Sequence, residues 1–357
     1  MSLIRFIKAK FLMSMVKDQL DFIDFNNIKS VLFLKYDKIG DMVVCTPVFR
    51  ELKKACPHMQ ISVLASKINQ DILSNNPYID KIYIYNNNCL KLFPVLFKLK
   101  ARNFDVCFEF EAKVVTRAIL ITKFINPKFS IATNKKHGRY GIDAKKLKVY
   151  DFYTTQNKKA HWSDICLETL GVFNLKPKSS KYDIFLNDNQ RRVSKNFIKK
   201  MPSAKIKIGI NLEGCSNNGE INSDDLRIIC QGIYQENAEI LIIILSKPGD
   251  ERKIEKLIKD MGLNYVVVSS YFSILEVSAL ISELDLVISP DTSIIHIASA
   301  FNIPSVSIYT ANKNNYRLWA PKSLLNKSVF SNDKETIRGY SVYDVVQSSL
   351  ELIKEIK

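Results

Sequence analysis

A short polar segment, Lys35 to Pro47, contains a carboxylate that could act as a base. It follows the apolar run 31–34, which reads as a buried strand, and it leads into a helix expected from Thr46 to Ala55. Gly40 permits a tight backbone path, and Asp41 comes where a strand-to-helix turn would aim a carboxylate beyond the strand. Such a group can take the proton from an attacking hydroxyl, but an Asp here also commonly caps the following helix, and the local sequence favours the cap.

A second polar turn, Asp291-Thr292-Ser293-Ile294, lies between the apolar run 286–289 and a helix of small residues. Exposed backbone amides and the positive end of a helix form a site for a diphosphate group. Asp291 or Thr292 could instead be a plain N-cap, which is compatible with phosphate binding. A lone helical histidine usually has a structural role. We nevertheless expect His296, on the first turn of this helix, to face the same ligand-binding cleft as the polar turn.

Short β-branched runs alternate with helical stretches along the chain, which is typical of βαβ units and parallel sheets. The pattern predicts an α/β protein with two doubly wound halves, and the boundary falls near 182–193. In such sheets ligands bind beyond the carboxyl ends of strands, where both polar segments fall. The expected strands are 31–34, 60–64, 81–85 and 104–108 in the first half, and 206–210, 240–245, 265–268, 286–289 and 305–309 in the second.

Four regions are therefore expected. Residues 1–22 form a basic amphipathic helix, and residues 28–185 form a first Rossmann-like domain. Residues 186–335 form a second such domain, and a helix within 336–357 packs back on the first. The N-terminal helix is too short and too charged to span a bilayer; it could lie on an anionic membrane or dock on its own domain.

The charge and the cysteine pattern limit the partners. The chain carries 52 Lys and Arg against 36 Asp and Glu, a net charge of +16, which favours anionic partners or serves solubility alone. No nucleic-acid recognition motif is found, so nucleic acid is not expected. The seven scattered cysteines fit neither a disulfide framework nor a metal site, and indicate a reducing cytoplasm.

Residues 133–160 read as long basic loops, including Lys135, Lys136 and Arg139.

Taken together, the segments Lys35–Pro47 and Ser289–Ala300 resemble the two signatures of the heptosyltransferases, glycosyltransferase family 9. The similarity continues through the segments 161–171, 209–211, 245–251 and 318–321, and so covers nearly the whole chain from about Val31. The resemblance implies a GT-B fold, in which two Rossmann-like domains face a central cleft. It also implies a metal-independent, inverting transferase with no cofactor, which moves a heptose from ADP-heptose to the lipopolysaccharide core.

The resemblance also implies roles for individual residues. Asp41 matches the proposed base, and His296 lies near the sugar. The acidic position that opens the helix after strand 240–245, Asp250 or Glu251, would bind the donor ribose. The other donor-binding candidates are Asp291, Thr292, Ser293, Ile294, Asn211 and Lys247, and the acceptor-binding candidates are Lys35, Lys38, Lys135, Lys136 and Arg139. The acceptor would be an anionic glycolipid, met by a peripheral protein on the cytoplasmic face of the inner membrane.

Two departures from the family pattern leave alternatives open. Ser293 stands where the family usually has glycine, and Glu220 lies where a lysine would neutralise donor phosphate. Either another cation replaces that lysine, with Lys247 the nearest candidate, or the donor differs. A different nucleotide sugar, or a non-catalytic protein that binds nucleotide sugar or glycolipid, would fit these changes. Dinucleotide-dependent oxidoreduction is disfavoured, because no G-x-G-x-x-G follows the first strand of either half.

Overall fold

The computed structural model divides the chain into two compact units, Met1–Ser180 and Lys181–Lys357. This boundary lies slightly before the 185/186 boundary expected from the sequence. The residues that the structure describes are 11, 14, 18, 20–111, 115–133, 149–154, 160–214, 219–236, 239–269 and 273–356. Most of the expected N-terminal helix, and the acceptor candidates Lys135, Lys136 and Arg139, lie outside these residues.

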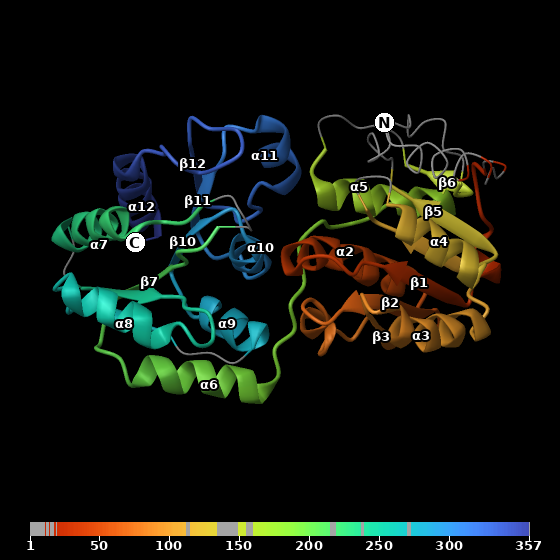
Figure 1. Cartoon of the computed structure of the whole chain (residues 1–357), viewed down its shortest axis with the longest axis horizontal. Helices are drawn as coiled ribbons and strands as arrows, with labels where there is room; N and C mark the ends of the chain where they lie inside the picture. The colour runs from red at the N-terminus through yellow and green to blue at the C-terminus, as the bar shows by residue number, and fades with distance from the viewer. Residues whose placement is uncertain are drawn as a thin grey trace. The chain divides into compact units, whose positions relative to one another are not determined.

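The first unit is built on a parallel sheet with the strand order β3-β2-β1-β4-β5-β6 (Figure 1). The chain runs outward from β1 in both directions, so the order reverses between β1 and β4. Such a reversal opens a crevice at the carboxyl ends of the two central strands. The strands are β1 (Ser30–Leu34), β2 (Gln60–Ser66), β3 (Lys81–Tyr85), β4 (Val106–Glu109), β5 (Phe129–Ala132) and β6 (Phe152–Tyr153).

Apolar side chains fix this sheet against its helices. Strand β1 is buried on both faces, and the Phe33 ring stacks on Phe108 of β4 with centroids 4.5 Å apart. Near-continuous apolar strands are typical of parallel sheets covered on both sides. The covering helices are α2 (Ile39–Ala55), α3 (Cys89–Ala101), α4 (Thr116–Ile125) and α5 (Trp162–Glu168), with short 3-10 turns η1 (Phe25–Asn27), η2 (Gln70–Leu73) and η4 (Thr169–Phe173).

Helix α2 begins at Ile39, well before the Thr46 start expected from the sequence. Pro47 lies inside this helix and has no N–H to donate to the carbonyl of Val43. The Thr46 hydroxyl donates to that same carbonyl at 2.7 Å and supplies a replacement bond. Asp41 consequently lies in the first helical turn, and the N-cap is Lys38, so the expectation that Asp41 caps the helix is wrong.

The second unit repeats this architecture with the parallel order β12-β11-β10-β7-β8-β9. Its order reverses between β7 and β10, which again places a crevice at the carboxyl ends of the central strands. The two sheets confirm the predicted doubly wound α/β class. The strands are β7 (Ile206–Ile210), β8 (Ile240–Ile244), β9 (Val266–Val268), β10 (Leu286–Pro290), β11 (Ser305–Tyr309) and β12 (Asn326–Phe330).

Helices cover this second sheet as well. The C-terminal helix α12 lies beside α7 and packs on β10, β11 and β12 (Figure 1). Its buried residues Val345, Leu352 and Ile353 join the core of the second unit. The expected packing of this helix on the first domain stays a prediction. The helices are α6 (Asp188–Lys199), α7 (Ser223–Glu236), α8 (Glu251–Asp260), α9 (Ile274–Ile281), α10 (Ser293–Ala300), α11 (Lys313–Trp319) and α12 (Val342–Ile356).

A helix that crosses a membrane must be long and apolar. Within the part of the chain that the structure describes, none combines the length and the apolar character needed to cross a bilayer.

Candidate functional site

A cluster of three charged side chains lies beyond the carboxyl end of β1. Lys35 follows the strand directly, its side chain is 1% exposed, and its Nζ lies 2.6 Å from Asp37 Oδ2 and 3.6 Å from Asp41 Oδ1. The carboxylate of Asp41 retains partial contact with solvent. The ammonium group of Lys35 therefore holds a reachable carboxylate at the switch point of the first sheet.

Burial and neighbouring charges shift the pKa values of Lys35 and Asp37 in opposite directions. Burial lowers the pKa of Lys35, but the nearby Asp37 and Asp41 carboxylates outweigh burial, and the pKa lies well above its ordinary value. Burial raises the pKa of Asp37, and the charge of Lys35 opposes that rise. Lys35 is thus a charged, buried lysine, and its contacts are with these carboxylates. We expected it to contact the acceptor, but the geometry gives it a supporting position.

The loop between β1 and α2 is locked by a buried amide that the sequence analysis missed. Asn69 Nδ2 donates to the carbonyls of Lys35 and Asp37 at 3.2 and 3.3 Å, and Asn69 Oδ1 accepts from the Ser66 amide. Ser66 Oγ also donates to the Asp37 carbonyl. These bonds fix the backbone that carries the charged cluster. Only the polar positions just after β2 hinted at this role in the sequence.

The turn after β10 is tied to the end of β7. Thr292 is the N-cap of α10, and its Oγ1 accepts from the Ile294 amide at 3.3 Å. Asn211, just after β7, donates through Nδ2 to Ser289 Oγ at 2.9 Å and to Thr292 Oγ1 at 3.3 Å. The predicted donor residues Asn211, Thr292 and Ile294 are therefore brought together. Since Asn211 is buried, it acts on the turn rather than at an open surface.

The residues of this turn and of the start of α10 differ in burial. Asp291, Thr292 and Ser293 are only half-buried, and Asp291 Oδ2 accepts a bond from Asn315 Nδ2 at 2.9 Å. His296 is buried, with its ring between Tyr182 and Trp319 at centroid distances of 6.2 and 6.0 Å. Burial lowers the pKa of His296 to about 4, so the ring is neutral at pH 7. In the described structure His296 is therefore a packed, neutral group behind the turn.

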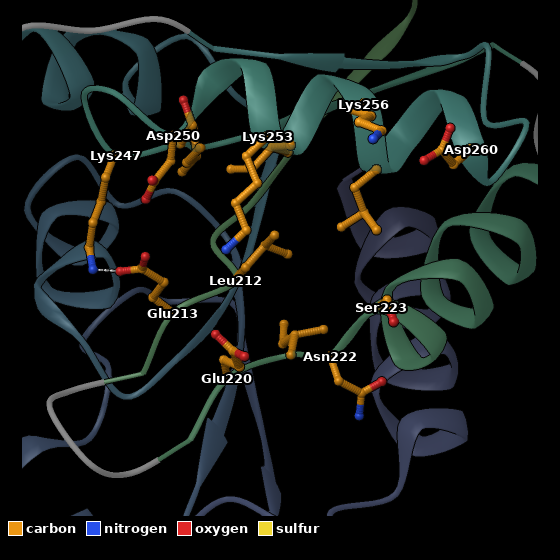
Figure 2. Close-up of a pocket in the computed structure, with 15 residues that line it drawn as sticks. Leu212, Glu213, Glu220, Asn222, Ser223, Lys247, Asp250, Lys253, Lys256 and Asp260 are labelled. Carbon is orange, nitrogen blue, oxygen red and sulfur yellow. Dashed lines mark ion pairs between the residues drawn. The ribbon is translucent and has the colours of Figure 1, made fainter.

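A pocket of about 440 Å³ lies in the same unit as this turn, and charged side chains gather around it (Figure 2). Asn211 connects the two, because its Nδ2 also donates to the carbonyl of Glu213, which lines the pocket. Apolar side chains of Leu212, Ile221, Ile254 and Leu257 form part of the wall. The charged lining residues are Glu213, Glu220, Asp250, Asp260, Lys247, Lys253 and Lys256. An apolar wall with a few convergent polar groups is the usual form of a small-molecule site.

The structure distinguishes the two residues that were expected to bind the donor ribose. Asp250 lines the pocket, and although it occupies the N-cap position of α8, its side chain makes no capping bond. Glu251 is not among the lining residues, and its Oε2 accepts from the Gly249 amide at 2.8 Å. Gly249 has a φ of +96°, which only glycine adopts readily, so this turn is shaped to present Asp250.

The cations of the pocket differ from expectation. Lys247, proposed as the replacement for the family's lysine, is ion-paired with Glu213 (Figure 2). Lys253 was missed; it extends from α8 toward Leu212 in the same view. Its position could have been found from helical spacing, because it comes three residues after Asp250 and therefore shares its face. Glu220 lies in this pocket too, so the acidic departure noted in the sequence affects the site directly.

A metal site in a protein needs several ligand side chains close together. Among the residues that the structure describes, no group of three or more His, Cys, Asp or Glu side chains could hold a metal ion.

Comparison with known proteins identifies a matching family. The model of glycosyltransferase family 9 (heptosyltransferase) matches residues 98–337. Lipopolysaccharide heptosyltransferase 1 of Campylobacter coli is 21% identical over 323 residues, which cover 86% of this chain and 90% of that protein. These matches confirm the resemblance found from the two polar segments.

Solved structures share the fold. A glycosyl transferase family 9 protein from Veillonella parvula DSM 2008 superposes with a TM-score of 0.76 at 16% identity, covering 94% of this chain and 100% of that one. The E. coli heptosyltransferase WaaC, solved with ADP, gives a TM-score of 0.70 at 14% identity, covering 90% and 99%. The predicted GT-B fold class is thereby confirmed.

Proposed function

The chain belongs to glycosyltransferase family 9, and we propose that it transfers a heptose from ADP-heptose to a lipopolysaccharide core or a related glycolipid. It is a glycosyltransferase enzyme of the heptosyltransferase type. The sugar and the nucleotide are taken from its relatives, since the Campylobacter relative is named for lipopolysaccharide heptosyl transfer and WaaC was solved with ADP. The observation that carries the proposal is the Asn211 link, which joins the turn at α10 to the charged pocket.

The donor is proposed to lie along this link in the second unit. The nucleoside occupies the pocket, where Asp250 accepts hydrogen bonds from the ribose hydroxyls. The diphosphate meets the first turn of α10, at Thr292 and Ser293, where the positive helix end favours an anion. Lys253 supplies positive charge from α8, whereas Lys247, in the loop before it, is paired with Glu213. His296 supports the turn from behind, as a neutral ring.

Transfer is proposed to invert the anomeric centre. Asp41 accepts the proton from the acceptor hydroxyl, and the hydroxyl oxygen forms its bond to the anomeric carbon from the face opposite ADP. The bond from that carbon to the diphosphate oxygen breaks, and the electron pair leaves with ADP. Lys35 fixes the Asp41 carboxylate, and the positive end of α10 stabilises the negative charge that develops on the leaving group.

The acceptor is proposed to be an anionic glycolipid on the cytoplasmic face of the inner membrane. The net charge of +16 favours this class. Lys38 lies exposed at the N-cap of α2, one turn before Asp41, where it could meet an acceptor phosphate. Lys135, Lys136 and Arg139 remain acceptor candidates from the sequence.

Calorimetric titration with nucleotide sugars tests the donor assignment. ADP-heptose is expected to bind and to raise the melting temperature of the protein. It is also expected to bind more tightly than UDP-sugars or GDP-sugars. The anomeric configuration of the product, measured by NMR, tests inversion. Preference for another nucleotide sugar would overturn the ADP assignment, and a product that keeps the donor configuration would overturn the inverting mechanism.

The acid-rich pocket gives one specific reason to keep the second candidate, a non-catalytic binding protein. Glu220 and Glu213 both line the pocket, and Glu213 already neutralises Lys247. Binding of a nucleotide sugar without any transfer or donor hydrolysis would support that alternative.

A further inference from the structure

Helix α3 has a second apolar face that is turned to solvent. Leu90, Phe93 and Phe97 are 81%, 51% and 61% exposed. The same helix buries Leu92, Leu96 and Leu99 against the first sheet. At 100° per residue, the exposed residues fall within an arc of about 60°, and the centre of this arc lies about 120° around the helix from the buried leucines. An amphipathic helix of a water-soluble domain needs only the inner face, so the outer apolar face requires another explanation.

This face continues onto the neighbouring helix α4. The rings of Phe97 and Phe124 meet edge to face, with centroids 5.3 Å apart. Leu120, one turn before Phe124, is 45% exposed. Leu90, Phe93, Phe97 and Leu120 together form what we term the α3–α4 apolar surface. Contiguous exposed apolar groups of this kind mark a surface that binds a partner.

The charged residues of the two helices have one sign. Helices α3 and α4 contain no Asp or Glu. Their basic residues are Lys91, Lys98, Lys100, Arg117 and Lys123. By helical spacing, Lys91 and Lys98 flank the exposed stripe of α3 on one side and Lys100 flanks it on the other. Apolar residues bordered by lysines are typical of helices that lie in the interface of an anionic membrane.

The surface begins at the edge of the sheet that carries Asp41. Helix α3 starts four residues after β3, and the carboxyl ends of parallel strands share one edge. Arg117, in the first turn of α4, binds the Tyr85 hydroxyl at the end of β3, and the Tyr85 ring stacks on Tyr36, next to Lys35. A partner that covers the start of α3 therefore lies at the edge of the unit where the acceptor is expected.

We propose that the α3–α4 apolar surface docks the protein on an anionic phospholipid bilayer. This inference rests on the proposed function, because a lipid-borne acceptor has to be reached at a membrane. A second copy of the chain fits less well, since a two-fold contact through this surface would bring like-charged helices together. Leu90, Phe93 and Phe97 insert among the acyl chains, and the flanking lysines contact the lipid phosphates.

Vesicle flotation of the full chain, without donor or acceptor, tests the docking surface. The protein is expected to bind vesicles of phosphatidylcholine with phosphatidylglycerol, to bind neutral phosphatidylcholine vesicles weakly, and to detach as salt rises. The Leu90→Ser/Phe93→Ser variant should bind at least about tenfold more weakly, because apolar burial is lost. Leu324→Ser/Tyr343→Ser removes apolar groups that are 84% and 72% exposed on the second unit, and should bind as the unaltered chain does.

A second pair of variants tests the charges. Lys91→Gln/Lys98→Gln should weaken binding to the anionic vesicles by about fivefold per lysine. The matched change on α6, Lys195→Gln/Lys199→Gln, removes two exposed lysines and should have little effect. Circular dichroism and the melting temperature check that each variant folds. All altered side chains are exposed, so small changes in stability are expected.

The outcomes separate docking from catalysis. Unchanged vesicle binding by Leu90→Ser/Phe93→Ser would overturn the proposal and place membrane contact elsewhere. Loss of a dimer in this variant, seen by sedimentation with vesicle binding intact, would assign the surface to a second copy instead. Transfer to a lipid-free acceptor oligosaccharide should remain normal in the variant. Absence of that transfer in the unaltered chain would count against the proposed function, whereas the vesicle result would still stand.

Discussion

At the scale of single residues, the first unit contains a carboxylate whose neighbours are unusual. Lys35 is enclosed at the end of β1, and its ammonium group lies between the carboxylates of Asp37 and Asp41. A buried lysine is costly unless it is paired, so this arrangement is maintained by both acids together. Of the two, Asp37 is the closer partner, which leaves Asp41 as the carboxylate available to a substrate.

Replacement of Asp41 tests its role as the base. Asp41→Asn keeps the shape of the side chain but removes the proton acceptor, so turnover should fall by about 100-fold or more. Donor affinity, measured by calorimetry, should stay within about twofold, since the donor is proposed to lie in the second unit. Asp344→Asn is the matched control, because Asp344 also lies in the first turn of a helix. Near-normal turnover of Asp41→Asn would remove Asp41 from the mechanism.

Replacement of Lys35 tests the support of the cluster. Lys35→Met leaves the Asp37 carboxylate without its partner, so the free energy of unfolding should fall by about 3 kcal/mol at pH 7. The pKa of Asp37 is already raised, and loss of Lys35 raises it further. A carboxyl group with a raised pKa binds protons more readily in the folded state, so stability is lost as pH rises through that pKa. Urea unfolding at several pH values should therefore show the deficit growing from pH 4 to pH 7.

A rescue variant makes this test specific. Asp37→Asn in the Lys35→Met background removes the isolated charge and should recover part of the lost stability at pH 7. A deficit that is independent of pH and is not recovered would mean that Lys35 acts through packing alone.

Lys253 is the residue through which the pocket is expected to compensate for Glu220. Lys253→Met should weaken binding of ADP by about tenfold, because a charge-assisted contact to phosphate is lost. Lys247→Met should have a smaller effect, since Lys247 is held by Glu213. Lys259→Met, on the same helix but outside the pocket, is the control. Equal affinities for all three variants would exclude Lys253 from the donor site.

At the scale of elements, the start of α2 decides where Asp41 lies. The sequence analysis predicted this start at Thr46, seven residues after the observed start at Ile39. The structure instead accommodates Pro47 in the helix interior, where the Thr46 hydroxyl binds the Val43 carbonyl. Local sequence could not reveal this, since the bond depends on a helix that tertiary packing stabilises. By contrast, buried strands such as β7 and β11 were predicted with their observed bounds, because their apolar runs are short and sharply ended.

The Thr46 bond can be measured with a double-mutant cycle. Thr46→Val leaves the Val43 carbonyl without this donor and should lower the free energy of unfolding by about 1 to 3 kcal/mol. In a Pro47→Ala background the backbone N–H of residue 47 can serve that carbonyl, so the same Thr46→Val change should cost less. Chemical denaturation of the four proteins gives the coupling. Equal costs in both backgrounds would show that the hydroxyl does not replace the missing bond.

Contacts between distant segments explain what the sequence left undecided at the site. Asn69 and Asp37 act through backbone carbonyls and buried charge, which have no sequence signature of their own. Asp250 and Glu251 are adjacent in sequence, and only the turn at Gly249 separates the one that lines the pocket from the one that does not. Lys253 could have been inferred from helical periodicity, since it shares a face with Asp250.

At the scale of the whole molecule, each unit places its polar residues at a reversal of strand order. In the first unit these residues follow β1, and in the second they follow β7 and β10. The general rule for open parallel sheets therefore explains why chemistry gathers in two segments far apart in the chain. Family membership then turns this architecture into a specific claim, that the protein transfers a sugar from a nucleotide donor to a glycolipid.

Mass spectrometry of the acceptor tests that claim most directly. The purified protein is incubated with ADP-heptose and a heptose-free lipopolysaccharide core acceptor, and ADP release is measured in the same samples. The account predicts an acceptor heavier by one heptosyl residue, with one ADP released per transfer, and neither change with Asp41→Asn. An acceptor of unchanged mass, although ADP-heptose binds to the protein, would contradict it.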